Sequence, residues 1–150
     1  MSLNKTLIIF LLLFLQPVLA TDYQHLIGKS DIRNIEGAKG HTGILVANDP
    51  NMIGVTILHY KDTILFALEE NRVVVSIFEA PLEKEGTLYT GGLCWVEGTR
   101  RPDIVFLVKI GERNQNFTEI LRSWKVDIKL KRFIETKVKE ARCVNNAYVD

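Results

Sequence analysis

Residues 52–78 read MIGVTILHYKDTILFALEENRVVVSIF, and apolar side chains recur at every second position through most of this stretch. Ile53, Val55 and Ile57 set the alternation in a first run, and it returns after Lys61-Asp62 and after Glu70-Asn71. A period of two residues places alternate side chains on one face of a β-strand. Branched and aromatic residues, which suit a pleated and half-buried surface, fill the runs. The stretch therefore predicts three antiparallel strands joined by tight turns.

The same pattern extends in both directions along the chain. Residues 41–47 form an earlier run, which ends in the turn-rich segment Asn48-Asp49-Pro50-Asn51. Residues 87–97 form a later run, and residues 126–130 alternate apolar with charged side chains. Residues 103–110 are nearly all apolar, which is typical of a strand buried on both faces. Strands that are apolar on both faces need cover on both sides, as in two packed sheets or a barrel.

Two segments depart from the β pattern. Phe117, Ile120, Leu121 and Trp124 recur at helical spacing, which predicts a short amphipathic helix. Residues 132–143 fit a helix or a strand, and the pattern leaves both interpretations open. We expect a mainly β fold: a single-domain antiparallel β-sandwich or small barrel with one or two short helices. The alternative is an α+β fold with a helix packed on an antiparallel sheet.

Residues 1–20 have the features of a cleavable signal peptide. Lys5 supplies a positive start, an unbroken apolar run covers residues 7–15, and the small residue Ala20 stands at the expected cleavage point. The run is too short to span a bilayer, which takes about 20 apolar residues. We therefore expect residues 21–150 to form one secreted, extracellular domain with no membrane span.

The net charge argues against nucleic acid as a partner. The chain has 19 Lys and Arg against 18 Asp and Glu, and removal of residues 1–20 takes away only Lys5. The remaining chain is neutral, so no overall field attracts it to a polyanion.

Cysteine usage and a glycosylation sequon agree with an extracellular location. Cys94 and Cys143 are the chain's two cysteines, and an even number in a secreted protein predicts a disulfide between them. Asn116-Phe117-Thr118 is a sequon in a polar stretch, which predicts a glycan on Asn116 in a surface loop.

No residue pattern predicts catalysis or a cofactor. The histidines His25, His41 and His59 form no metal-binding pair motif, although His41 and His59 would face each other if the first two strands paired in register. Ser76 lies in an apolar run without a nucleophile-elbow motif. The carboxylates Glu69 and Glu70 are interpreted as part of a solvated turn. We therefore expect no catalytic residue, no metal ligand and no cofactor.

Charge is distributed unevenly along the chain. Residues 62–85 hold six acidic against two basic residues, a net charge of −4, and residues 125–139 hold six basic against two acidic, a net charge of +4. The second segment predicts a basic contact patch that suits an acidic protein or a sulfated glycan. The patch comprises Lys125, Lys129, Lys131, Arg132, Lys137 and Lys139.

These observations favour a non-enzymatic extracellular binding protein that acts through a protein partner. The alternative is a carrier that holds a small apolar ligand in a barrel or between sheets, because several strands are apolar on both faces. A small secreted hydrolase is a third and weaker hypothesis.

Overall fold

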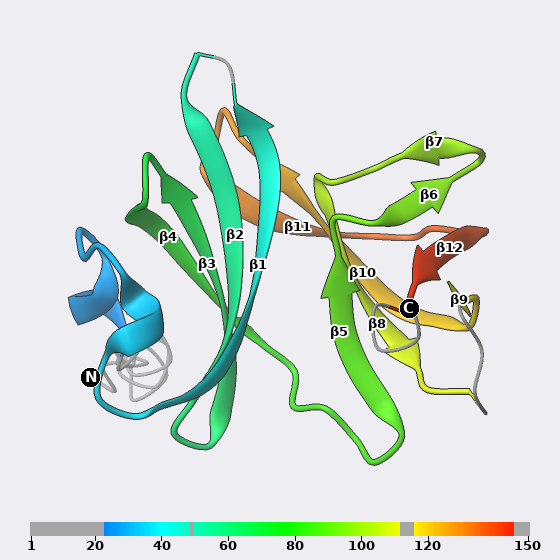
Figure 1. Cartoon of the computed structure of the whole chain (residues 1–150), viewed down its shortest axis with the longest axis horizontal. Helices are drawn as coiled ribbons and strands as arrows, with labels where there is room; N and C mark the ends of the chain where they lie inside the picture. Colours follow the sequence, from blue (N-terminus) through cyan, green and yellow to red (C-terminus); the bar gives the residue numbers. More distant parts are fainter. Residues whose placement is uncertain (1–22, 49, 112–115, 146–150) are drawn as a thin grey trace, which may run out of the picture.

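The computed structural model of this chain describes residues 23–48, 50–111 and 116–145. The signal peptide expected at residues 1–20 lies outside the described residues. The described part is built from strands that gather into three antiparallel sheets, with two short 3₁₀ turns near the N-terminal side (Figure 1).

The first sheet, called sheet A here, is a meander of four consecutive strands. They are β1 (Ala38–Asn48), β2 (Met52–Tyr60), β3 (Thr63–Glu70) and β4 (Val73–Ala80). The turn between β3 and β4 holds Asn71 and Arg72 at φ 51° and 67°, a left-handed pair whose twist matches that of a tight hairpin. The three strands expected within residues 52–78 are confirmed.

Two further four-stranded sheets complete the fold. Sheet B has the order β11-β10-β8-β5 and sheet C the order β7-β6-β12-β9. The strands of sheet B are β5 (Thr87–Gly91), β8 (Ile104–Lys109), β10 (Ile120–Asp127) and β11 (Arg132–Thr136). The strands of sheet C are β6 (Cys94–Val96), β7 (Thr99–Arg100), β9 (Asn116–Phe117) and β12 (Ala141–Val144).

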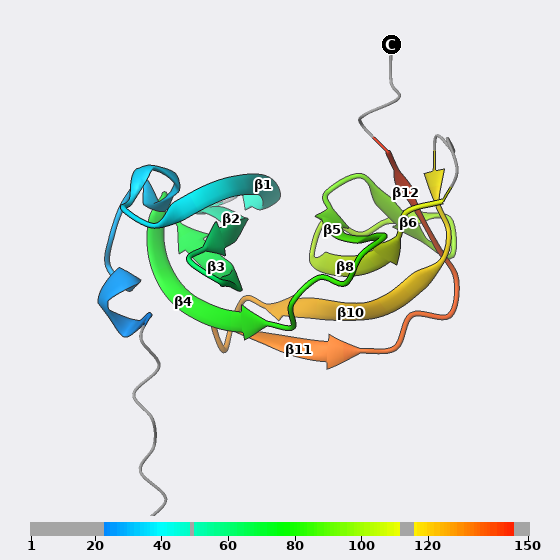
Figure 2. The ribbon, with the colours of Figure 1, turned by 90° about the horizontal axis from the view of Figure 1, so that it is seen from below.

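Sheets A and B pack face to face as a β-sandwich (Figure 2). Every sheet is open, because each has two edge strands, so the expectation of a small barrel is wrong and that of a sandwich is confirmed. The helices of the described part are the 3₁₀ turns η1 (Gln24–Leu26) and η2 (Ile32–Asn34), so the α+β alternative does not describe this fold.

Aromatic rings fill the space between sheets A and B. Phe66 of β3 is fully buried, and its ring centroid lies between 5.0 and 5.7 Å from those of Phe78, Tyr89, Trp124 and Phe133. Tilted and edge-to-face contacts at these distances add to the stabilisation that burial of the rings provides. This cluster fixes the separation of the two sheets.

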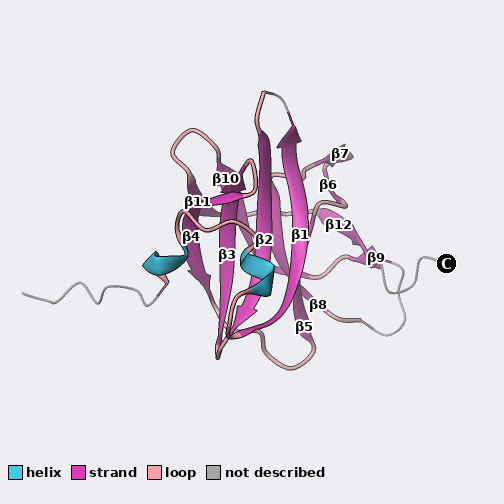
Figure 3. Cartoon of the chain, turned by 60° about the vertical axis from the view of Figure 1, so that its left-hand side comes forward, coloured by secondary structure: helices cyan, strands magenta, loops and turns pink. Residues whose placement is uncertain are grey.

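The outer face of sheet A is covered in part by the N-terminal segment. Leu26 of η1 and Ile32 of η2 pack on Leu58, Leu65 and Val74 of that face. Figure 3 shows η1 beside β4 at the edge of the sheet and η2 in front of β2. The segment reaches the start of β4, where Ser30 forms an isolated β-bridge with Val73 beside the β3–β4 turn.

Sheet C covers the outer face of sheet B and holds the disulfide. Cys94 of β6 and Cys143 of β12 stand directly opposite each other, are bonded, and are fully buried beside Phe106 of β8. The predicted disulfide is confirmed. It joins the end of the described chain to its middle across 49 residues.

The helix expected over residues 117–124 is wrong. Phe117 belongs to β9, and Ile120 to Trp124 lie in β10. Phe117 and Ile120 pack in the layer between sheets B and C, whereas Trp124 packs toward sheet A. A register shift between Ile120 and Arg122 interrupts the alternation. A bulged strand with cover on both faces thus produced an apolar spacing that resembles a helix.

Two other expectations are settled at the same place in the chain. The strand expected over residues 126–130 ends at Asp127, and residues 128–131 form the turn that follows it. The sequence pattern of residues 132–143 fits a helix or a strand, and the structure has strands there. Strand β11 covers Arg132–Thr136, and strand β12 begins at Ala141.

Candidate functional site: the β10–β11 hairpin

Strands β10 and β11 form a hairpin at the edge of sheet B. Its register pairs Lys125 with Ile134 and Asp127 with Arg132, so these four side chains share the face that points away from sheet A. Trp124 and Val126 point the other way, into the core between the sheets. Alternation along the hairpin therefore separates a buried face from an exposed one.

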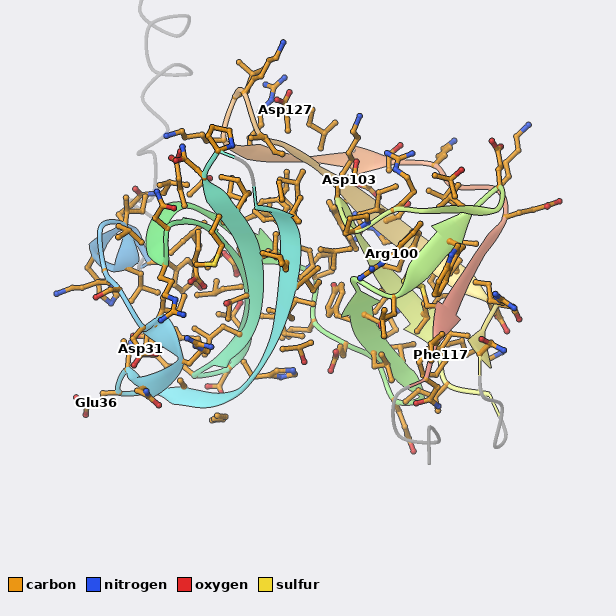
Figure 4. The ribbon with its side chains drawn as sticks, turned by 45° about the horizontal axis from the view of Figure 1, so that its top comes forward. Asp31, Glu36, Arg100, Asp103, Phe117 and Asp127 are labelled. Atoms are coloured by element: carbon orange, nitrogen blue, oxygen red, sulfur yellow. A yellow bond between two sulfur atoms is a disulfide. The ribbon has the colours of Figure 1, made fainter. Side chains whose placement is uncertain are left out.

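The turn of the hairpin is held by Asp127. Its carboxylate oxygen Oδ1 accepts a hydrogen bond of 3.0 Å from the backbone N–H of Leu130, and Lys131 has a left-handed φ of 48°. An aspartate that bonds the backbone a few residues ahead stabilises a turn. Figure 4 shows Asp127 at the projecting end of this element.

The turn end of the hairpin is fixed to Asp103, the residue before β8. The backbone N–H of Val126 donates to the carbonyl of Asp103 at 2.8 Å, and Arg101 forms two 2.8 Å hydrogen bonds with the Asp103 carboxylate. The Arg101 guanidinium holds the pKa of Asp103 below its usual value, and Asp103 raises the pKa of Arg101. The segment that anchors the hairpin is thus stabilised by a charged pair.

One ion pair connects the hairpin with sheet A, and a second links the two strands of the hairpin to each other. Lys131 Nζ lies 2.9 Å from Glu70 Oε2, and this contact with Lys131 lowers the pKa of Glu70. Arg122 forms a two-pronged pair with Glu135 at 2.8 and 2.9 Å, while its guanidinium lies 4.9 Å from the ring centre of Trp124. Hydrogen bonding to Arg122 lowers the pKa of Glu135.

Large apolar side chains are exposed on the same hairpin. Ile128, Leu130 and Ile134 are 42%, 60% and 40% exposed. The first two stand in the turn, on either side of Lys129, and Ile134 stands opposite Lys125 on the outward face. Apolar and cationic side chains therefore alternate on one hairpin, which hydrogen bonds and ion pairs hold in place. We call this set the hairpin surface: Lys125, Ile128, Lys129, Leu130, Arg132 and Ile134.

The structure brings together part of the predicted basic patch. Lys125, Lys129 and Arg132 lie on the hairpin surface, while Lys131 beside them is paired with Glu70. Lys137 and Lys139 follow the other end of β11, and Lys137 is about 17 Å from Arg132 at the rise of an extended strand. The six residues of the predicted patch therefore form two separate groups of cations. The group on the hairpin lies beside exposed apolar side chains.

The sequence pattern missed those apolar neighbours. Ile128 and Leu130 continue the alternation of Val126, which indicated a strand with one buried face. The signal for a turn was weak, because Asp127 is the only turn-favouring residue in the segment and no glycine or proline follows it.

Asn116 lies at the edge of sheet C and not in a loop. It pairs with Val144 in the two-residue strand β9 and is half-buried, while Thr118 of the sequon is exposed. The glycan on Asn116 stays a prediction. Figure 4 shows Phe117, the next residue, at the end of the molecule away from Asp127, so a glycan there would leave the hairpin surface open.

Residues that suit metal binding or hydrolysis do not converge in the described part of the chain. Within residues 23–48, 50–111 and 116–145, no three His, Cys, Asp or Glu side chains gather in a way that would hold a metal ion. The register pairs His59 with Gly40 and His41 with Leu58, so the two histidines are not directly opposite. Over the same residues, no helix has the length and apolar character needed to cross a bilayer.

A cleft opens at the end of the sandwich near the β2–β3 turn. Its volume is about 690 Å³, and its walls combine the apolar side chains of Ile64 and Leu82 with charged ones, which are Lys39, Lys61, Asp62 and Glu83. The cleft lies at the surface, whereas the interior between the sheets is occupied by the ring cluster around Phe66. A carried ligand would therefore have to bind in the surface cleft and not between the sheets.

Comparison of the chain with protein-family models, with curated proteins and with solved structures finds no significant match.

Proposed function

We propose that this chain is a secreted, non-enzymatic binding protein whose hairpin surface docks onto an acidic patch of a protein partner. The observation that carries the proposal is the alternation of three exposed apolar side chains with three cations on a braced hairpin. Contiguous exposed apolar side chains mark interaction sites, and complementary charge orients and accelerates association.

Secretion is part of the proposal and is supported by three features. They are the signal-like sequence at residues 1–20, the buried disulfide between Cys94 and Cys143, and the sequon at Asn116. Expression of the full chain in a secreting cell line tests it by intact mass. We expect a product that begins at Thr21, contains the disulfide and loses mass on glycan removal. A chain retained in the cell with residues 1–20 attached would contradict secretion.

Binding to intact cells of the source organism tests the partner. The purified, fluorescently labelled protein is added to cells that have been treated with trypsin, with heparin lyase, or left untreated. We expect trypsin to abolish saturable binding and heparin lyase to leave it unchanged. Loss of binding after heparin lyase alone would overturn the protein-partner proposal in favour of a sulfated glycan.

An apolar variant tests whether more than charge is involved. Ile128→Ser with Leu130→Ser keeps every cation, and both side chains are exposed, so the fold is expected to persist. We expect at least a tenfold loss of affinity for the cell surface. The matched control is Ile110→Ser, which removes an apolar side chain of 47% exposure just after β8, at the end of that strand away from the hairpin turn. Equal binding by the double variant and the control would contradict the proposal.

The carrier hypothesis remains a second proposal because of the surface cleft of about 690 Å³. A pocket of this size fits the range of small-molecule sites. Native mass spectrometry of the secreted protein tests it. An added mass that disappears on denaturation is expected for a carrier, and its absence in protein taken directly from the host would contradict it.

A further inference from the structure

A second hollow lies on the outer face of sheet A, where the cover by the N-terminal segment ends. It has a volume of about 320 Å³ and is lined by Gly43, Leu45, Gly54, Thr56, Glu69 and Arg72 among others. It lies on the face of sheet A opposite the core shared with sheet B. Figure 4 shows Asp31 and Glu36 of the covering segment beside this face.

The hollow exists because two positions of the face carry no side chain. The register places Gly43 of β1 beside Thr56 and Gly54 of β2 between Leu45 and Glu69, so these residues form one layer of the sheet surface. A Cβ added at Gly43 would meet no atom within 4 Å, and one at Gly54 would lie 3.4 Å from the carbonyl of Ile44. Packing therefore does not demand glycine at either position.

The floor of the hollow holds a buried carboxylate. Glu69 is 8% exposed, and Thr56 Oγ1 donates a hydrogen bond to one of its oxygens. The interpretation of Glu69 as part of a solvated turn is therefore wrong, although its neighbour Glu70 does lie at the surface. No Lys or Arg of the described segments forms an ion pair with Glu69.

The Glu69 carboxylate accepts one hydroxyl hydrogen bond and has no ion pair within the described segments, so its remaining lone pairs can accept further hydrogen bonds. A cation that enters the hollow would supply a charged partner for this carboxylate. The ammonium group of a ligand is the simplest cation that fits beside Gly43 and Gly54.

The walls add a second charge and an apolar surface. Two exposed arginines, Arg33 and Arg72, line the hollow. Arg33 is paired with Asp31 at 3.5 Å, whereas Arg72 forms no ion pair with another residue of the described segments. Leu45 is 55% exposed and lies on the same wall as Met52. The hollow thus combines an anion, a cation and an apolar side.

We propose that this hollow binds a free α-amino acid with an apolar side chain. Glu69 receives the ammonium group, Arg72 receives the carboxylate, and the side chain lies against Leu45 and Met52. The volume suits one such molecule, and the pairing of opposite charges at the two ends orients it.

Calorimetric titration of the secreted protein with L-leucine tests the proposal, with L-leucinamide and 4-methylpentanoate as analogues that lack one charge each. We expect leucine to bind with one site and each analogue at least tenfold more weakly. Absence of leucine binding overturns the proposal. Binding of leucinamide as tight as that of leucine overturns the assignment of an amino acid and indicates an amine.

Variants locate the site. Gly43→Leu places a side chain in the hollow at a position whose added Cβ meets no atom within 4 Å. Glu69→Gln removes the charge and keeps an acceptor for Thr56. Each is expected to abolish leucine binding. Gly40→Leu is the matched control, because Gly40 is also a β1 glycine with open space around its Cβ position and lines the larger cleft instead of the hollow. Loss of leucine binding in Gly40→Leu alone would place the ligand in that cleft and overturn the proposal. Circular dichroism confirms that each variant is folded. Leucine binding that survives in folded Gly43→Leu overturns the proposal.

Discussion

Lys131 and Glu70 stand 61 positions apart in the sequence, and their Nζ and Oε2 atoms lie 2.9 Å apart. The pair joins the basic segment of the chain to the acidic one, and it ties the turn of the β10–β11 hairpin to the end of β3. Part of the basic segment is therefore neutralised by an ion pair with the acidic segment of the same chain. Lys129, two residues away, forms no ion pair with another residue of the described segments and belongs to the hairpin surface.

The two lysines should respond differently to removal of their charge. Lys131→Gln is expected to speed amide hydrogen exchange in β10 and β11, and Lys129→Gln is expected to leave it unchanged. Lys131 lowers the pKa of Glu70 from its ordinary 4.5, so the contribution of the pair is complete above that pH and is lost as pH falls through the lowered value. Exchange measured at neutral and acid pH checks both points; equal protection in the two variants would contradict them.

Removal of the disulfide should destabilise the sandwich substantially. Cys94→Ser with Cys143→Ser opens a loop of 49 residues, and the chain-entropy model gives a loss of roughly 4 kcal/mol in the free energy of unfolding. Urea denaturation followed by tryptophan fluorescence measures it. A loss below about 1 kcal/mol would show that sheet C is held mainly by its packing on Phe106.

The ring cluster should be the most sensitive part of the core. Phe66→Ala is expected to cost about 3–5 kcal/mol, because the fully buried ring contacts four others and leaves a cavity between two sheets. Leu82→Ala, at a side chain that is 61% exposed, should change the free energy of unfolding by less than about 0.5 kcal/mol. Similar losses for the two variants would contradict the assigned core.

Tyr89 should limit stability at alkaline pH. Burial raises its pKa to about 12 from 10.0, and its hydroxyl donates to the carbonyl of Pro81. The unfolded chain releases this proton first as pH rises, so the stabilisation is complete below pH 10 and is lost as pH rises through about 12. Tyr89→Phe should flatten the fall of unfolding free energy over this range. An unchanged slope in the variant would contradict the assignment.

The local pattern was sufficient for the hairpins of sheet A. Alternation and turn-forming residues lie next to each other in the sequence, as at Asn71, so residues 52–78 could be predicted. Strand β10 could not, because its apolar residues face two different sheets and a bulge at Leu121 breaks the period.

Of the candidate site, only the charged residues could be predicted from the sequence. The cations of residues 125–132 are visible in the sequence, but the exposure of Ile128 and Leu130 depends on where Asp127 ends the strand. The burial of Glu69 likewise depends on the neighbouring strands and not on the adjacent Glu70. Each is a property of tertiary packing, which no short window of sequence contains.

Two matched charge reversals test the hairpin surface most directly. Lys129→Glu with Arg132→Glu alters the hairpin, and Lys137→Glu with Lys139→Glu makes the same change in net charge beyond the other end of β11. The measurement is the dissociation constant of each secreted variant on intact cells. We expect at least a tenfold weakening for the first pair and less than twofold for the second. Equal weakening by both pairs, or none by either, would contradict a partner site on the hairpin.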